Sequence, residues 1–432
     1  MVGVGLLVAG VSAYGFVALS TRVLGEVRYG PLGALWALVF LAGPGLFLPV
    51  EQEVSRAIAA RRARRLGGAP VVRRAAIAGA GLLLAVLIVL GGTSRWAVDH
   101  IFDQQLLLLT GLALGLAAAL AAHLTRGCLS GTGNFRGYGT FIGADGFIRF
   151  LGCALLALIG VRTAGLYGIA LGIAGLLAVP VALRVQRPRL EEGPESSWSE
   201  INTALGYLLM ASLCAYGIMN IGPVLVQGLA SPAEADLAGR FLPAVIVSRI
   251  PLFLFQAVQA ALLPKLAGLA SAGRLGDFRN GLRRLLVVVA GLAVVGTIGG
   301  WAIGPFVVKI MSGPQFELSH RTLGLLAAGS GFYMLALAVA QAVIALGGHR
   351  DQAVGWVAGL GVLLLTAWVA SDDLYLRVEL ALLCGSLAAL CVMTALLVRR
   401  LSAVSQAAVE VEAGDILDPL HDVAMSPTAV EA

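Results

Sequence analysis

The feature that most constrains this chain is the recurrence, along most of its length, of apolar stretches of about 20 residues. A helix of about that length spans the hydrocarbon core of a bilayer. Charged residues make up only 12% of the chain, about half the usual fraction in a soluble domain. We therefore predict an all-α, polytopic membrane protein with about twelve transmembrane helices in two six-helix bundles. The predicted spans are residues 2–21, 31–50, 75–93, 105–124, 138–160, 164–183, 202–228, 240–263, 285–304, 321–345, 354–371 and 378–398.

The cations lie mainly in the short connections between these spans. With the N-terminus inside, most loop arginines fall on the cytoplasmic side, as the positive-inside rule requires. Arginine is used almost to the exclusion of lysine, which suggests a bacterial genome of high GC content. We expect a bacterial plasma-membrane protein with both termini in the cytoplasm. The net charge of +6 reflects this excess of loop arginines and does not indicate nucleic-acid binding.

The chain divides near its middle at a polar, proline-containing stretch, residues 184–200. Gly133-Asn134-Phe135-Arg136 follows the fourth span, and Gly347-Gly348-His349-Arg350 follows the tenth, about half a chain later. Parallel repeats of this kind are common among secondary transporters. We predict an N-terminal bundle over 1–183, a cytoplasmic linker over 184–200 and a C-terminal bundle over 201–400. The acidic segment 401–432 is expected to be a disordered cytoplasmic tail.

The sequence holds little that could carry catalysis. It contains no P-loop, no GxSxG motif and no paired carboxylates on a substantial loop. The five cysteines and five histidines show no metal-ligand spacing. We expect no enzymatic activity, no cofactor and no metal.

Asp145 and Arg149 stand inside the apolar run 141–161. A guanidinium in a bilayer costs about 3 kcal/mol on insertion scales. A spacing of four puts both side chains on one helical face, where they can pair. One interpretation is a structural ion pair between packed helices. The other is a cationic group that lines a pathway for an anionic substrate.

Arg249 lies in the eighth predicted span with no ionic residue within four positions. It either caps carbonyls of a neighbouring helix or binds substrate. We assign Arg22, Arg28, Arg149 and Arg249 to an anionic headgroup site, because arginine binds phosphate through a planar two-point fork. The remaining polar candidates could line or gate a cavity, although amides in membrane helices often only join helices. These candidates are Glu51, Glu53, Arg56, Asp145, Asn220, Gln256 and Gln259.

Several short segments resemble the multidrug/oligosaccharidyl-lipid/polysaccharide (MOP) exporter superfamily. Thr21-Arg22-Val23-Leu24-Gly25 with Tyr29-Gly30 is similar to the first-span signature of its lipid-linked saccharide flippases. Gly239-Arg240-Phe241, residues 251–260 and Leu263-Pro264-Lys265-Leu266 resemble the eighth span of the polysaccharide-exporter, Wzx-like branch.

This resemblance implies two six-helix bundles that operate by alternating access. It implies that an isoprenoid-pyrophosphate-linked oligosaccharide is moved from the cytoplasmic to the outer leaflet during cell-envelope polysaccharide biosynthesis. Arg22 and Arg28 match arginines of the peptidoglycan-precursor branch by their spacing, and Arg249 matches more loosely. The chain departs from that branch because the seventh span has no central acidic residue, which leaves the coupling ion open.

Two alternatives stay open. A MATE-like antiporter of small amphipathic compounds has the same architecture, but the first and seventh spans lack a central carboxylate. A non-transporting scaffold for envelope-synthesis enzymes is supported only by the acidic tail. For a flippase, the expected partners are the lipid-linked saccharide, membrane lipids and envelope glycosyltransferases or a polymerase. The family leads us to expect a monomer.

Overall fold

The computed structural model describes the backbone of residues 2–197, 205–252, 255, 268–269 and 272–424, and the side chains as far as Ala403. The described chain is helical without strands, so the predicted all-α class is confirmed. Ten of its helices are long and apolar enough to cross a membrane, which makes this a multi-pass membrane protein.

The first helix, α1 (Val2–Ala63), contains both the first and the second predicted span. Its halves meet at Gly25, where φ is 73° and ψ is 171°, a backbone conformation that residues other than glycine rarely adopt. The ring centroids of Phe16 and Trp36 lie 5.2 Å apart, whereas 20 helical residues in line would separate them by about 30 Å. The two halves of α1 therefore form a hairpin.

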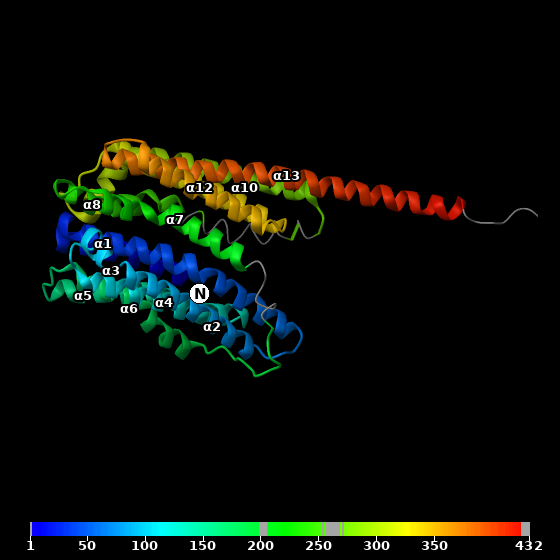
Figure 1. Cartoon of the computed structure of the whole chain (residues 1–432), viewed down its shortest axis with the longest axis horizontal. Helices are drawn as coiled ribbons and strands as arrows, with labels where there is room; N and C mark the ends of the chain where they lie inside the picture. Colours follow the sequence, from blue (N-terminus) through cyan, green and yellow to red (C-terminus); the bar gives the residue numbers. More distant parts are fainter. Residues whose placement is uncertain (1, 198–204, 253–254, 256–267, 270–271, 425–432) are drawn as a thin grey trace, which may run out of the picture.

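The other helices fall into two lobes that α1 joins (Figure 1). The N-lobe contains α1 with α2 (Ala69–Gly92), α3 (Ser94–His100), α4 (Leu106–Gly131), α5 (Phe135–Leu158) and α6 (Ala164–Val185). The C-lobe contains α7 (Leu205–Leu229), η2 (Pro232–Glu234), α8 (Ala235–Ser248), α10 (Leu275–Ser312), α11 (His320–Ala345), α12 (His349–Val369) and α13 (Leu374–Ala424).

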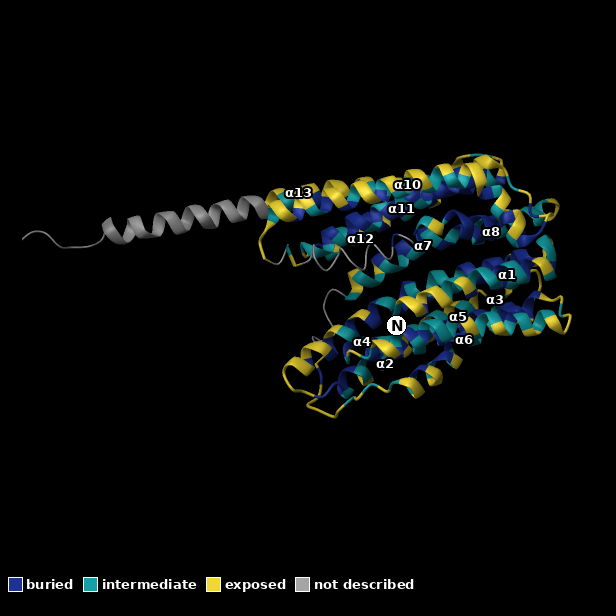
Figure 2. Cartoon of the chain, turned by 180° about the vertical axis from the view of Figure 1, so that it is seen from behind, coloured by how far each residue is buried: buried dark blue, intermediate teal, exposed yellow. Residues whose placement is uncertain are grey.

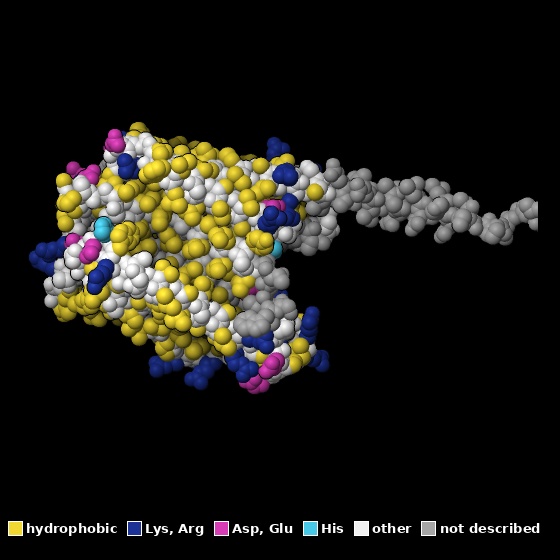
Figure 3. Space-filling view, viewed as in Figure 1, with side chains coloured by type: hydrophobic (Ala, Val, Ile, Leu, Met, Phe, Trp, Pro, Cys, Tyr) yellow, Lys and Arg dark blue, Asp and Glu magenta, His cyan; other side chains and the backbone are white. Residues whose placement is uncertain are grey.

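Each lobe buries a hydrophobic core of its own (Figure 2). Phe16, Tyr29 and Tyr167 are fully buried in the N-lobe, and Phe241 and Trp356 in the C-lobe. On the face that Figure 3 shows, hydrophobic side chains cover the middle of both lobes, and the charged side chains lie mostly towards the ends and along the lower edge. This distribution suits a bilayer, in which only apolar side chains meet the lipid tails without cost. The bundle boundaries predicted from the sequence remain predictions.

The segment after α6 packs against the N-lobe. Arg61, which is buried, donates from Nη1 to the carbonyls of Gly67 and Pro194, both at 2.9 Å. The Ala69 amide donates to the carbonyl of Glu191 at 3.1 Å. Residues 191–194 of the predicted linker therefore lie across the connection between α1 and α2. Residues 198–204 of the predicted linker lie outside the described residues.

Helix α13 runs past the bundle as far as Ala424 (Figure 1). The disordered cytoplasmic tail expected over 401–432 remains a prediction. The last residues, 425–432, lie outside the described part of the chain.

The lobes meet most closely at the end that carries the Gly25 turn, α3 and η2, which we call the kink end. Arg240 Nε lies 2.7 Å from Glu26 Oε2 across the lobes. A Cβ added to Gly239 would lie 1.6 Å from the Glu26 carbonyl oxygen, and one added to Gly30 would lie 2.4 Å from Gln227 Oε1. At Gly239 only a hydrogen side chain permits this approach of α1 to α8, because the atom in the way belongs to the backbone, whereas at Gly30 it is the end of a flexible side chain.

The opposite end, which carries residues 64–68, 132–134 and 186–197, is here called the linker end. The described ribbons diverge towards it (Figure 2), and the space-filling surface shows a recess between the lobes there (Figure 3). Described contacts between the lobes are made by α1 with α7, α8 and α10. Within the described part of the chain, the lobes are therefore closed on one another at the kink end and diverge at the linker end.

We predict that Gly239→Ala opens the kink end, because the added Cβ would overlap the Glu26 carbonyl oxygen. Spin labels at Val27 and Leu229, both exposed, would report the separation of the lobes, after Cys384 and Cys391 are replaced by serine. The distance distribution should shift to longer values. Gly228→Ala is the matched control, because a Cβ there meets nothing within 4 Å. An unchanged distribution in a well-folded Gly239→Ala protein would contradict the role of this contact.

Candidate functional site

The middle of the interface between the lobes is formed by α1 and α7. Asn220 of α7 is buried, and its Nδ2 donates to the Phe40 carbonyl of α1 at 3.2 Å. The same amide donates to the Tyr216 carbonyl one turn earlier at 3.1 Å. We call this contact zone of Phe40, Tyr216 and Asn220 the seam.

Arg249 reaches the seam from the C-lobe. Helix α8 ends at Ser248, and Pro251 follows closely. A proline disfavours helical geometry at the residue before it and lacks the amide that would continue the hydrogen-bond ladder. The Arg249 side chain therefore leaves a break in the helix, and Nη1 donates to Asn220 Oδ1 at 3.1 Å.

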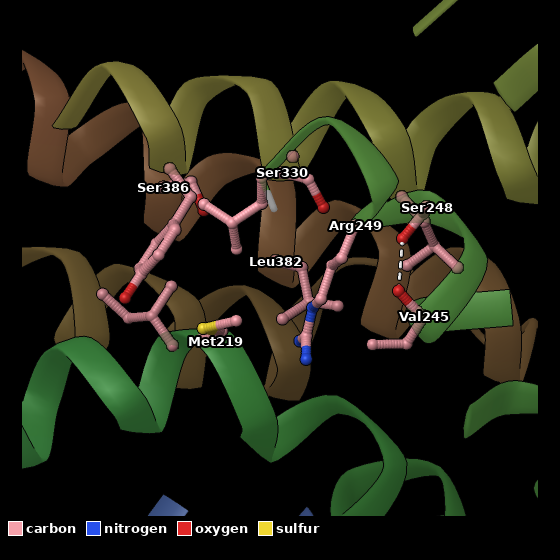
Figure 4. A pocket seen from close by; sticks show the side chains of 12 residues that line it. Met219, Val245, Ser248, Arg249, Ser330, Leu382 and Ser386 are labelled. Atoms are coloured by element: carbon pink, nitrogen blue, oxygen red, sulfur yellow. Dashed lines mark hydrogen bonds between the residues drawn. The ribbon is translucent and has the colours of Figure 1, made fainter. Parts of the chain in front are cut away.

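Arg249 also lines a cavity inside the C-lobe (Figure 4). The cavity measures about 30 Å³, which is room for little more than a water molecule. Its polar lining consists of Ser248, Ser330, Tyr333 and Ser386 in addition to Arg249. Among the described residues, no carboxylate lies within ion-pair distance of Arg249. Its charge is therefore met only by neutral groups.

Arg149 is held differently. Its Nη2 lies 2.7 Å from Asp145 Oδ2 and 3.0 Å from Asp145 Oδ1. Its guanidinium carbon lies 5.2 Å from the Phe40 ring centroid and 5.7 Å from that of Trp36, within the range of cation–π attraction. Phe40 thus touches Arg149 through its ring and Asn220 through its carbonyl. The observed contact is thus an ion pair within α5, and it lies at the edge of the seam.

Arg22 and Arg28 lie at the kink end and are exposed. Arg22 donates to the carbonyls of Ile310 and Met311, in the last turn of α10, where a cation complements the helix dipole. No hydrogen bond or ion pair joins Arg28 to another described residue. The structure therefore does not bring the four predicted arginines together: Arg149 and Arg249 share the seam, whereas Arg22 and Arg28 do not.

Glu51 and Glu53, predicted as cavity or gating residues, have separate partners. Glu53 accepts from Arg56 at 2.8 Å near the linker end. Glu51 lies in a buried network, in which His123 Nδ1 is 2.7 Å from Oε2. Its other partners are Arg126, with Nη2 at 3.2 Å from Oε1, and Tyr138, whose hydroxyl donates to Oε1 at 3.0 Å. Gln256 and Gln259 lie outside the described residues.

Sequence reasoning missed His123, Arg126 and Tyr138. The predicted fourth span stopped at residue 124 and left Arg126 to a loop, whereas α4 continues to Gly131. The available signal was Glu51 at the end of the second span, since a buried carboxylate needs donors. In the described part of the chain, no three His, Cys, Asp or Glu side chains form a metal site.

We compared the chain with proteins of known sequence and known structure. No family model matches it. Two proteins of Mycobacterium tuberculosis, the uncharacterized proteins Rv3630 and Rv1510, are 26% and 24% identical to it over 410 and 416 residues. These alignments cover 89% and 92% of this chain and 88% and 91% of those proteins.

Solved structures of MATE family transporters of the MOP superfamily share the fold. An inward-facing conformation of a multidrug resistance MATE transporter superposes with a TM-score of 0.69 at 13% identity, covering 93% of this chain and 96% of that one. A MATE protein in the straight conformation gives a TM-score of 0.62 at 14% identity, covering 93% and 95%. The chain therefore has the MATE transporter fold, and the solved structures that it resembles are transporters rather than enzymes.

We predict that Asp145→Ala destabilises the protein by about 1–3 kcal/mol, the usual cost of leaving a hydrogen-bonding group without its partner, because the Asp145–Arg149 pair is partly buried. Thermal unfolding in detergent measures the loss. The double variant Asp145→Ala with Arg149→Met should recover most of it, because no unpaired charge remains. A single variant as stable as the wild type would show that Arg149 does not depend on Asp145.

Proposed function

We propose that this protein is a membrane transporter that moves an isoprenoid-pyrophosphate-linked oligosaccharide from the cytoplasmic to the outer leaflet during cell-envelope polysaccharide biosynthesis. The observation that carries the proposal is the charge balance at and beside the seam. The guanidinium groups of Arg126, Arg149 and Arg249 lie there with the carboxylates of Glu51 and Asp145. One positive charge, that of Arg249, has no described counter-charge.

An uncompensated cation at membrane depth is costly, and that cost falls when an anion binds beside it. A guanidinium forks onto two phosphate oxygens, which suits a diphosphate head. The cavity at Arg249 is too small for the head itself. The proposed cargo would therefore enter through the recess at the linker end and approach Arg249 from the seam, while the lipid tail stays in the bilayer.

The proposed orientation puts the linker end in the cytoplasm of a bacterial plasma membrane. Support comes from the arginines that flank this end, in the segments 56–74 and 184–189, which the positive-inside rule assigns to the cytoplasm. In that orientation the described conformation faces inward. Arg22 and Arg28 would then lie at the outer exit, where an anionic head leaves. We propose a monomer that receives its cargo from envelope glycosyltransferases and delivers it to a polymerase.

The second candidate is an antiporter of small amphipathic compounds, which the likeness to multidrug resistance transporters favours. Near the seam a cationic cargo would find no unpaired carboxylate among the described residues, because Glu51 and Asp145 are both paired with arginines. Deletion of the gene separates the two candidates. A flippase deletion should accumulate a lipid-linked saccharide on the cytoplasmic face, and an antiporter deletion should change only drug sensitivity.

We predict that Arg249→Ala inserts normally but flips lipid-linked sugar at least tenfold more slowly, since a hydrogen bond to a charged group contributes about 1.5–3 kcal/mol. The measurement is translocation of a fluorescent isoprenoid-diphosphate sugar in reconstituted vesicles. Arg95→Ala is the control, because that arginine is exposed at the kink end. Wild-type flipping by Arg249→Ala would remove this residue from the mechanism.

We predict that a chain ending at Leu401 transports at the wild-type rate, because the seam and both cores lie before that residue. Complementation of a deletion strain by the truncated chain is the measurement. Loss of complementation by a stably inserted truncation would favour a scaffold role for the acidic tail.

A further inference from the structure

A second arginine lies one helical turn from the Arg249 contact. Tyr216 of α7 is close enough to Arg126 and Glu51 to interact with them electrostatically, and Asn220 binds Arg249. Residues four apart share a helix face and are separated by about 6 Å along the axis. The same face of α7 therefore lies near Arg126 of the N-lobe and binds Arg249 of the C-lobe, with Arg126 nearer the linker end.

The Arg126 guanidinium has unused hydrogen-bonding capacity. Its Nη2 donates to the Tyr138 hydroxyl at 3.0 Å and lies 3.2 Å from Glu51 Oε1. Its Nε is buried and has no hydrogen-bond partner among the described residues. The side chain remains 23% exposed, although that of Glu51 is only 8% exposed. The Arg126 side chain is therefore partly accessible, whereas that of Glu51 is buried.

We propose that Arg126 is the N-lobe half of the anion site, and that Glu51 holds it only while no cargo is bound. This inference rests on the proposed function, which it extends to a binding residue on the other lobe. A diphosphate carries more negative charge than one guanidinium offsets. Arg126 and Arg249 together would bind it from both lobes, so that cargo draws the lobes together at the linker end.

The exchange is feasible because Glu51 has other donors. When Arg126 turns to the cargo, the Tyr138 hydroxyl still donates to Oε1, and His123 Nδ1 still donates to Oε2. Asp145 differs, because Arg149 Nη2 contacts both of its oxygens and no other described donor is bonded to them. Moving Arg149 would leave a bare carboxylate, which is costly. Arg126 is therefore the exchangeable arginine, and Arg149 the fixed one.

The test is binding of inorganic pyrophosphate to the full-length protein in nanodiscs, measured by calorimetry. Arg126→Gln should weaken binding about tenfold or more, as expected for a lost charge-assisted hydrogen bond. Glu51→Gln should strengthen binding several-fold, because it removes the competing carboxylate. If Glu51 had a purely structural role, Glu51→Gln would lower the stability of the protein without raising its affinity for pyrophosphate. Arg136→Gln is the control, because that arginine is exposed near the linker end.

Arg126→Lys covers the case in which the glutamine variants fail to fold. It keeps the charge but loses the fork, so binding should weaken several-fold at an unchanged melting temperature. Wild-type affinity in a folded Arg126→Gln or Arg126→Lys protein, or no gain in a folded Glu51→Gln protein, would overturn the inference. If Arg249→Ala weakens binding and Arg126→Gln does not, only this inference fails. If neither matters, the proposed function fails with it.

Discussion

The arrangement of the lobes depends on one electrostatic constraint, a positive charge at membrane depth without a described negative partner. Arg249 extends from a break in α8 and bonds to the neutral side chain of Asn220. Asn220 in turn bonds to the backbone of Phe40 in the other lobe. This chain of contacts ties the cation to the interface between the lobes, where an anion could reach it from the linker end.

Helix α1 makes that interface possible. Its reversal at Gly25 brings both halves into the N-lobe core, and its second half supplies Phe40 to the seam. Close approach at Gly30 and Gly239 then joins the lobes at the kink end. A close contact at one end and a recess at the other are the geometry that the proposed alternating access would need.

The arginines near the seam differ in the groups that compensate their charges. This difference distinguishes a structural arginine from the arginines proposed to bind an anion. Arg149 is bound to one carboxylate that depends on it, and it lies on two aromatic rings. Arg126 shares Glu51 with two other donors. Arg249 has only neutral partners among the described residues. The three arginines thus range from one paired with a single carboxylate, through one that shares its carboxylate, to one without a described carboxylate partner.

Much of this protein follows from local sequence. Apolar runs of bilayer length determine the helices, and the four-residue spacing determines the Asp145–Arg149 pair, because both are properties of a single helix. The end of α4 could not be predicted from local sequence. Arg126 remains in the helix because Glu51, 75 positions away, compensates its charge. The network around Glu51, the Arg249–Asn220 contact and the separation of Arg22 and Arg28 from the seam were decided by tertiary packing, since contacts between distant helices have no local sequence signal.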